Sequence, residues 1–218
     1  MGALLVAVKS SFADMQAGKH DKIRASWALQ FRNKAHLKFF IGRETFELGG
    51  VSRSVSTTAD NSYVGKADEV IVEAPDSAMG DVKKVRRICG FISSKVISHV
   101  LIVDVNSVVN VNAALSTPYE SFDYLGTFDN WGDIGPRAFM KPNGETETIE
   151  RCFDFAKGEH GVFLSRRAAL EVADTPLRLG SFISGSNWDL WIGQVIGPLV
   201  GEEHFLTMPV EPVAEKTN

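Results

Sequence analysis

The sequence has 218 residues, a formal net charge of −4 and a pI of about 5.8. This length predicts one α/β domain, and the acidic balance argues against a protein coated in basic surface, although a local basic groove is still allowed. No stretch approaches the ~18–20 apolar residues that a membrane span needs, and the first twelve residues lack a basic region and a cleavage site. We therefore expect a soluble, cytoplasmic protein.

Alternating strand and helix patterns fill the first half of the chain. The helix expected after the first loop carries Ile23, Trp27 and Phe31 on one face and has Asp21 as its N-cap. A later helix has an apolar stripe flanked by Lys83, Lys84, Arg86 and Arg87, which we interpret as a solvated face. The predicted elements are strands at 4–9, 37–41, 69–73 and 100–103, a loop at 10–19, a loop or weak strand pair at 47–66, and helices at 22–31 and 81–94.

The second half continues the alternation with shorter elements. The segment 130–150 is too long for a simple connector and is predicted to be an irregular functional loop. The predicted elements are a short helix at 113–115, strands at 124–128 and 162–165, and helices at 166–173 and 189–196. Together they predict a mostly parallel central sheet flanked by helices in a single domain at 1–208, followed by a flexible tail at 209–218.

The two cysteines, Cys89 and Cys152, are predicted to be buried free thiols in a reducing cytosol, with a disulfide as the alternative.

The segment VLIVDVN (100–106) carries the main functional signal. An apolar strand runs directly into Asp104, Val105 and Asn106. A strand that ends in polar residues delivers them to the carboxyl edge of the sheet, where open α/β sheets bind ligands. An Asp with a second oxygen donor two residues on can hold a divalent cation against a diphosphate. This is the layout of the D-x-D motif of nucleotide-sugar glycosyltransferases, with Asn106 in the last place.

Six segments, in order along the chain, resemble motifs of the β-1,3-galactosyltransferase and fringe-like glycosyltransferases, in the short soluble form seen in phage and bacterial proteins. The opening resembles "I-K-S-S … R-x-x-I-R-x-T-W", and the later segments are similar to "F-L-L-G", "D-x-Y-x-x-L-x-x-K-T", "K-x-D-D-D", "G-Y-V-L-S-R-D-A-A" and "E-D-V-x-x-G". The segments are VAVKSS (6–11) with KIRASW (22–27), FFIGR (39–43), APDSAMGDVKKVRRICGF (74–91), LIVDVN (101–106), GVFLSRRAA (161–169) and WDLWIG (188–193).

The resemblance implies a single-domain GT-A fold and an inverting transfer of a sugar from a UDP-sugar to an acceptor hydroxyl. Asp189 falls at the family's base, which takes the acceptor's proton. The donor nucleotide is expected to contact Val8, Lys9, Ser10, Arg24, Asp76, Lys84, Asp104, Val105 and Asn106. A Mn²⁺ or Mg²⁺ ion is expected on Asp104, Asn106 and His204. This site has one carboxylate fewer than the family motif, and basic residues could compensate by neutralising the diphosphate.

The acceptor is harder to assign. Its expected contacts are Trp131, Arg137, His160, Trp188 and Trp191, with core packing as the alternative for the two tryptophans of 188–193. The phage-like resemblance suggests a 5-hydroxymethylpyrimidine in DNA, in the host cytoplasm, and such a base would have to be flipped out of the duplex. A bacterial surface-glycan precursor or a small metabolite is the alternative acceptor.

Three rival functions stay open. The first is a pseudoenzyme of the same fold that binds a nucleotide or glycan without transfer. The second is a DNA-interaction module, and the third is another nucleotide-binding enzyme such as a nucleotidyltransferase.

Overall fold

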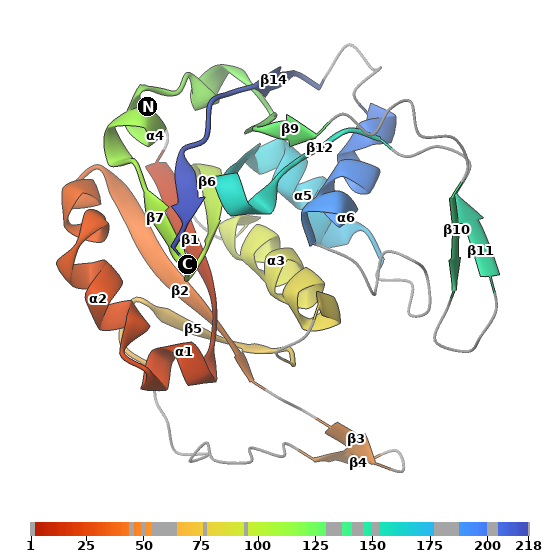
Figure 1. Cartoon of the computed structure of the whole chain (residues 1–218), viewed down its shortest axis with the longest axis horizontal. Coiled ribbons are helices and arrows are strands. Elements are labelled where there is room, and N and C mark those ends of the chain that lie inside the picture. Colours follow the sequence, from red (N-terminus) through yellow and green to blue (C-terminus); the bar gives the residue numbers. More distant parts are fainter. Residues whose placement is uncertain are drawn as a thin grey trace.

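The computed structural model describes residues 3–43, 46–48, 51–53, 65–75, 78–93, 96–129, 137–140, 146–149, 153–176, 188–199 and 205–217. A seven-stranded sheet forms the centre, with strand order β14-β8-β13-β6-β1-β2-β5 (Figure 1). Its strands are β1 (Ala3–Ser11), β2 (Ala35–Arg43), β5 (Glu69–Glu73), β6 (Ile97–Asp104), β8 (Tyr124–Gly126), β13 (Val162–Ser165) and β14 (Thr207–Pro209).

The sheet is mostly parallel. β1 pairs in parallel with β2 and with β6, β2 with β5, and β14 with β8, whereas β13 runs antiparallel to both of its neighbours. The predicted fold class, an α/β domain with a mostly parallel sheet flanked by helices, is confirmed. Short two-stranded pairs lie outside this sheet: β3 (Phe46–Leu48) with β4 (Val51–Arg53), β7 (Ser107–Val109) with β15 (Ala214–Lys216), β9 (Phe128–Asp129) with β12 (Phe155–Ala156), and β10 (Arg137–Met140) with β11 (Thr146–Ile149).

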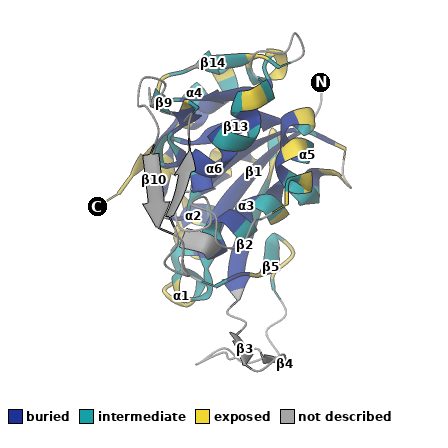
Figure 2. Ribbon diagram, turned by 90° about the vertical axis from the view of Figure 1, so that its right-hand side faces the viewer, coloured by how far each residue is buried: buried dark blue, intermediate teal, exposed yellow. Residues whose placement is uncertain are grey.

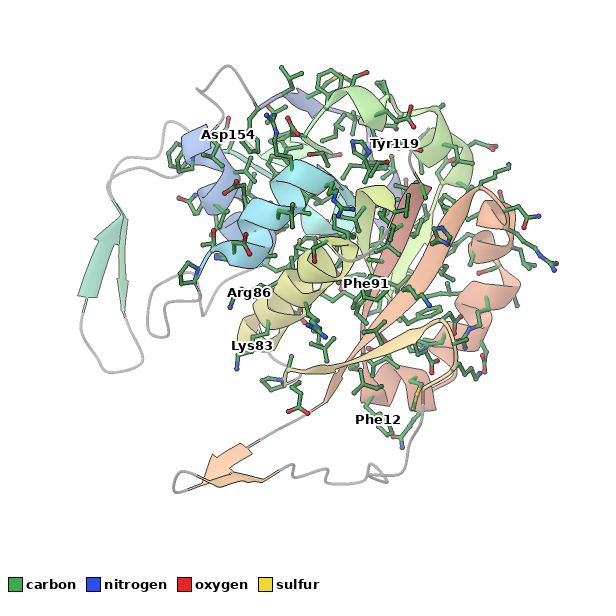
Figure 3. The ribbon with its side chains drawn as sticks, turned by 180° about the vertical axis from the view of Figure 1, so that it is seen from behind. Phe12, Lys83, Arg86, Phe91, Tyr119 and Asp154 are labelled. Carbon is green, nitrogen blue, oxygen red and sulfur yellow. The ribbon has the colours of Figure 1, made fainter. Side chains whose placement is uncertain are left out.

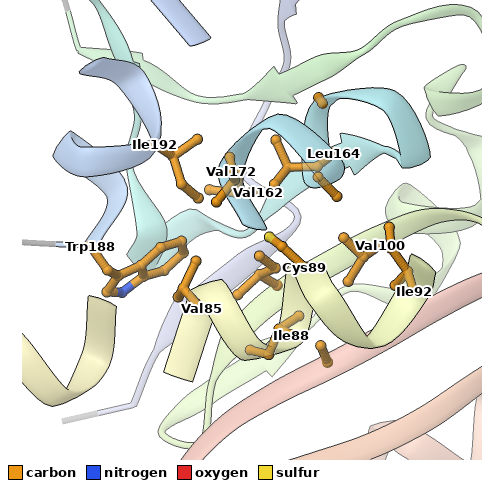
Figure 4. Packing of buried hydrophobic residues seen from close by; sticks show 14 of the residues in the cluster. Val85, Ile88, Cys89, Ile92, Val100, Val162, Leu164, Val172, Trp188 and Ile192 are labelled. Atoms are coloured by element: carbon orange, nitrogen blue, oxygen red, sulfur yellow. The ribbon is translucent and has the colours of Figure 1, made fainter. Parts of the chain in front are cut away.

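Two apolar layers cover the two faces of the sheet, and the buried strands lie between them (Figure 2). One face packs against α3 (Ala78–Ser93), α5 (Arg166–Asp174) and α6 (Trp188–Ile196). Cys89 of α3 lies at the centre of this layer, close to Val172 and Ile192 (Figure 4). It is a free thiol, and burial raises its pKa; Cys152 lies outside the described residues.

The opposite face packs against shorter helical elements. They are α1 (Phe12–Gln16), α2 (Lys19–Ala25), the 3₁₀ helices at Trp27–Phe31 and Tyr119–Ser121, and α4 (Val111–Ser116). Of two further 3₁₀ turns, Gly158–His160 precedes β13 in the sequence and Gly197–Leu199 follows α6.

Alternation along β1 divides its side chains between the two layers. Leu5 and Ala7 belong to the layer under α3, and Val6 and Val8 to the layer under α2. Because successive residues of a strand point to opposite faces, Lys9 follows the first set and Ser10 the second. The last two residues of this buried strand therefore present an ammonium group to one side of the sheet and a hydroxyl to the other.

Two local predictions in the first loop are wrong. The predicted loop at 10–19 contains α1, because Ser11 caps it: Ser11 Oγ accepts a hydrogen bond from the Asp14 amide at 3.0 Å, and Asp14 Oδ2 accepts one from the Ser11 amide. The next helix begins after Gly18, whose φ of 73° suits glycine, so Asp21 lies inside the first turn and is not the N-cap. The predicted apolar face, which consists of Ile23, Trp27 and Phe31, is nevertheless buried.

Part of the segment 130–150, predicted to be irregular, forms the antiparallel pair of β10 and β11. Its remaining residues lie outside the described part of the chain.

The prediction of a flexible tail at 209–218 is also wrong for the residues that the structure describes. β15 pairs with β7, and Val213 is only 2% exposed. The amide of Asn110 donates a hydrogen bond to the Val213 carbonyl at 2.8 Å, and the Val213 amide donates one to the His160 carbonyl. The apolar residues of PVEPVAEKTN therefore add to the core. Among the described residues, no helix has the length and apolar character that crossing a membrane would require.

We predict that Val213→Asp strongly destabilises the protein, because it buries a carboxylate with no partner. The expected loss is about 3 kcal/mol or more in urea denaturation. Glu215→Gln on the same strand is the matched control and should leave stability within about 0.5 kcal/mol, since Glu215 is exposed. Equal midpoints for Val213→Asp and the parent would contradict a packed tail.

Candidate functional site

A pocket of about 260 Å³ opens where β1 and β6 end. Six of the residues expected at the donor nucleotide were Lys9, Ser10, Lys84, Asp104, Val105 and Asn106, and all six line it. The structure thus brings together residues that are up to 97 positions apart in the sequence, from Lys9 to Asn106. The carboxyl edge of a parallel sheet is the position at which open α/β folds bind ligands.

Lys9 is the central charge of the pocket. It is 5% exposed, and its Nζ lies 2.5 Å from Asp81 Oδ2 and 3.1 Å from Asp104 Oδ1. A lysine this buried needs compensating charge, and the two carboxylates supply it. An ammonium group has three N–H donors, so these two contacts leave one N–H that a ligand oxygen can accept.

A second buried lysine extends the same wall. Lys84 is 3% exposed, and its Nζ lies 3.3 Å from Asp81 Oδ1, so that Asp81 bridges Lys84 and Lys9. Its side chain crosses the backbone of Gly42, where an added Cβ would collide with Lys84 Cε and with the Ala74 carbonyl. The close approach of β2 to α3 therefore depends on a glycine.

The prediction of a solvated basic face on α3 is wrong for Lys84, which lines the pocket as the motif resemblance implied, and for Arg86, and it agrees with the placement of Lys83 and Arg87. Lys83 points outward from the helix (Figure 3), and Arg87 is exposed. Arg86 is half-buried and donates a hydrogen bond to the Ala173 carbonyl at 2.8 Å.

A third lysine closes the outer side of the pocket. Lys19 Nζ lies 2.6 Å from Asp14 Oδ1 and donates to Asn106 Oδ1 at 2.7 Å. Three ammonium groups and the three carboxylates of Asp14, Asp81 and Asp104 thus gather at one opening. Sequence reasoning missed Ser11, Asp14, Lys19 and Asp81; the S-x-x-D capping box at 11–14 was the available signal for two of them.

The donor set fits a divalent cation poorly. Asp104 is paired with Lys9, and the side-chain oxygen of Asn106 already accepts from Lys19. Within the described residues, no cluster of three or more His, Cys, Asp or Glu side chains has metal-binding geometry. His204, the expected third ligand, lies outside those residues. Two ammonium groups therefore lie against the oxygens that a metal would need.

Asp189 lies at the start of α6, on the Lys9 side of the sheet. Its Oδ2 accepts from the Gly158 amide at 2.8 Å, and its Oδ1 from the Leu190 amide at 2.9 Å. Burial raises the pKa of this carboxyl, while the two amides and the charge of Lys9 act in the opposite direction. A carboxylate has about four lone-pair positions, so two backbone bonds leave room for a proton from a substrate.

Trp188 links Asp189, its neighbour in the sequence, to the pocket around Lys9. It is 5% exposed, and Lys9 Nζ lies 5.4 Å from the centre of its ring, within the range of a cation–π contact. Its ring also lies against Gly158, where an added Cβ would overlap the indole. Lys9 therefore contacts Asp104 in an ion pair, and its charge lowers the pKa of Asp189, which is not among the residues that line the pocket.

Other predicted residues are not brought to this pocket. Arg24 instead binds Asp21, Asp68 and Glu69 in an ion-pair cluster. Val8 is fully buried in the core, in the apolar layer under α2.

The expected acceptor contacts are divided. Trp188 and Trp191 are 5% and 2% exposed and pack in the core, so the structure supports the alternative of core packing for both residues. His160 is half-buried and lies 3.4 Å, through Nδ1, from the Ala214 carbonyl. Asp76, Trp131 and the side chain of Arg137 lie outside the described part of the structure.

Comparisons with known proteins do not identify a family for this chain. No family model matches the chain, and no curated protein matches it. Two solved structures of HddC from Yersinia pseudotuberculosis are similar, one of them complexed with GMP-PN. The first has 9% identity and a TM-score of 0.36 and covers 98% of this chain and 92% of its own. The second has 9% identity and a TM-score of 0.35, with 99% and 93% covered. Such a likeness carries no argument about function.

We predict that Gly158→Ala destabilises the protein, because the new methyl group must displace the Trp188 ring and the amide that holds Asp189. The expected cost is about 1–3 kcal/mol in urea denaturation. Gly90→Ala is the matched control: Gly90 lies in α3, where an added Cβ would make an ordinary contact of 3.9 Å with Ala173 Cβ, and the change should stabilise by about 0.5–1 kcal/mol. A stabilising Gly158→Ala would contradict the packing of Trp188 on this turn.

Proposed function

We propose that this chain is an inverting glycosyltransferase of GT-A fold that moves a sugar from a UDP-sugar to an acceptor hydroxyl. The observation that carries the proposal is that Lys9, which pairs with Asp104 in the pocket, also lies over the ring of Trp188 and exerts its charge on the adjacent Asp189. A UDP-sugar has a diphosphate next to its reacting anomeric carbon. A lysine that serves both the pocket and a carboxylate outside its lining suits that arrangement.

In the proposed reaction, Asp189 takes the proton of the acceptor hydroxyl as its oxygen attacks the anomeric carbon. The bond from that carbon to the β-phosphate oxygen breaks, and UDP leaves with the bonding electrons. Because attack and departure occur on opposite faces of the sugar, the anomeric configuration is inverted. Lys9 donates to the departing phosphate, and its field is preorganised by Asp81 and Asp104.

The diphosphate is proposed to be held by lysines. Lys9 and Lys84 are buried at the pocket wall, and Lys19 lies at its rim. Their carboxylate partners fix the ammonium groups in place, so little side-chain entropy is lost when the anion binds. The expected Mn²⁺ or Mg²⁺ is then dispensable, which agrees with the loss of an acid at Asn106.

A pseudoenzyme of the same fold is the second candidate. The observation that favours it is that both oxygens of Asp189 accept backbone N–H bonds, as a purely structural helix cap would. The acceptor is a further proposal: a 5-hydroxymethylpyrimidine in DNA or a surface-glycan precursor.

We predict that Asp189→Asn lowers UDP release from a UDP-sugar by about 100- to 10,000-fold, because the base is lost. In the parent, activity rises with pH through the pKa of Asp189, since the carboxylate must be ionised to accept a proton. Burial raises that pKa, so the acid limb lies above 3.8, the ordinary value for Asp, and the variant has no such limb.

The same reactions are run on hydroxymethylated DNA with pooled UDP-sugars, followed by mass spectrometry of the nucleosides. A hexose or pentose increment would identify DNA as the acceptor, and UDP release without it would favour a glycan precursor. Parent turnover equal to that of Asp189→Asn would support the pseudoenzyme.

We predict that Lys9→Met weakens UDP binding by about 10- to 100-fold in calorimetry, because a charge-assisted contact to phosphate is lost. Lys83→Met on the outer side of α3 is the matched control and should bind as the parent does. Adding Mn²⁺ should change parent affinity less than twofold. A tenfold or greater gain with Mn²⁺ would show that the metal, and not the lysines, neutralises the diphosphate.

A further inference from the structure

A buried hydrogen-bonded relay ends in the pocket wall at Ser10. Ser10 and His20 are 3% and 1% exposed, and Ser10 Oγ lies 2.7 Å from His20 Nε2. This pair lies on the α2 side of the sheet, opposite Lys9. The motif resemblance assigned His20 no role, and sequence spacing alone would not pair it with Ser10.

The other side of the histidine is held by Glu69. His20 Nδ1 lies 3.1 Å from Glu69 Oε1, and the Glu69 side chain has no exposed surface. Glu69 Oε1 also accepts from Arg24 Nη2 at 2.7 Å, and Oε2 accepts from the Lys66 amide at 2.9 Å. The His20 ring stacks on Phe39, with centroids 4.2 Å apart. The imidazole therefore has one defined orientation.

These contacts determine the direction of each hydrogen bond. Glu69 receives two other N–H donors, so it acts as an acceptor toward His20, whose Nδ1 must carry the hydrogen. Burial is the main cause that lowers the pKa of His20, and the charge of Arg24 adds to it, while Glu69 and Asp14 raise it. The neutral ring then has a lone pair on Nε2, and the Ser10 hydroxyl donates to it.

Ser10 is left with lone pairs to offer to the pocket. Its alternative acceptor, the Ser11 carbonyl, is more distant at 3.3 Å. The arrangement resembles that of a nucleophilic serine, but the pocket beside it holds Asp14 and Asp104. These carboxylates, like the Ser10 hydroxyl oxygen, accept hydrogen bonds and so favour a ligand that brings N–H or O–H donors. Recognition of a ligand donor suits the site better than attack.

We propose that the Ser10–His20–Glu69 relay fixes Ser10 as a hydrogen-bond acceptor that selects the nucleoside of the ligand through one of its donors. This inference rests on the proposed function and assigns the base-and-ribose end of the nucleotide to the part of the pocket next to Ser10. The donor is either the N3–H of uracil or a ribose hydroxyl. Ser10 contacts the ligand, whereas His20 and Glu69 are positioning residues that act through it.

The test is calorimetric binding of UDP, 2′-deoxy-UDP and N3-methyl-UDP to the full chain and its variants. We expect Ser10→Ala and His20→Phe each to weaken UDP about three- to tenfold, the range for a neutral hydrogen bond. The double variant should be no weaker than Ser10→Ala, because both changes act on one contact. His99→Phe, at another buried histidine, is the matched control and should leave UDP affinity unchanged.

The analogues identify the donor. One of them should bind the parent three- to tenfold more weakly than UDP and should lose no further affinity in Ser10→Ala. If UDP binds but neither analogue discriminates, or if the two single variants are additive, the relay inference falls and the proposed function stands. If the parent does not bind UDP at all, both fall. If His20→Phe does not fold, Ser10→Ala with the analogues decides.

Discussion

The pocket at the end of β1 and β6 depends on the buried ammonium group of Lys9, which forms ion pairs with Asp81 and Asp104. Removing a lysine from water is costly, and here two carboxylates from different elements offset that cost. The same ammonium lies over Trp188 and acts on Asp189. A single charge therefore couples the end of the central strand, the long helix α3 and the start of α6.

The strand period then divides the chemistry between the two faces. Lys9 faces the layer that contains α3 and α6, where phosphate and acceptor chemistry is proposed, whereas Ser10 faces α2 and its relay. Two consecutive residues are thus proposed to bind different parts of one ligand, because neighbouring side chains of a strand point in opposite directions. A register shift of one residue would exchange the ammonium and the hydroxyl and destroy both functions.

Much of the fold could be predicted from the sequence, because the buried strands are continuous apolar runs and α3 has a clear helical stripe. The apolar run before Asp104 was enough to place that residue at the sheet edge. The errors arise where tertiary contacts decide: the tail has few apolar residues, yet Val213 is buried by its pairing with β7. Lys84 looked solvated, and it is buried because Gly42 admits its side chain. The relay joins positions 10, 20 and 69, a set that no local pattern reveals.

The most direct measurement is a crystal structure of the protein with UDP, grown without added metal and again with Mn²⁺. The account predicts a diphosphate within hydrogen-bond distance of Lys9 and Lys84 in both crystals, with its terminal oxygen directed toward Asp189. A diphosphate bound elsewhere on the molecule, or one that reaches Asp104 by way of a manganese ion with Lys9 displaced, would contradict it.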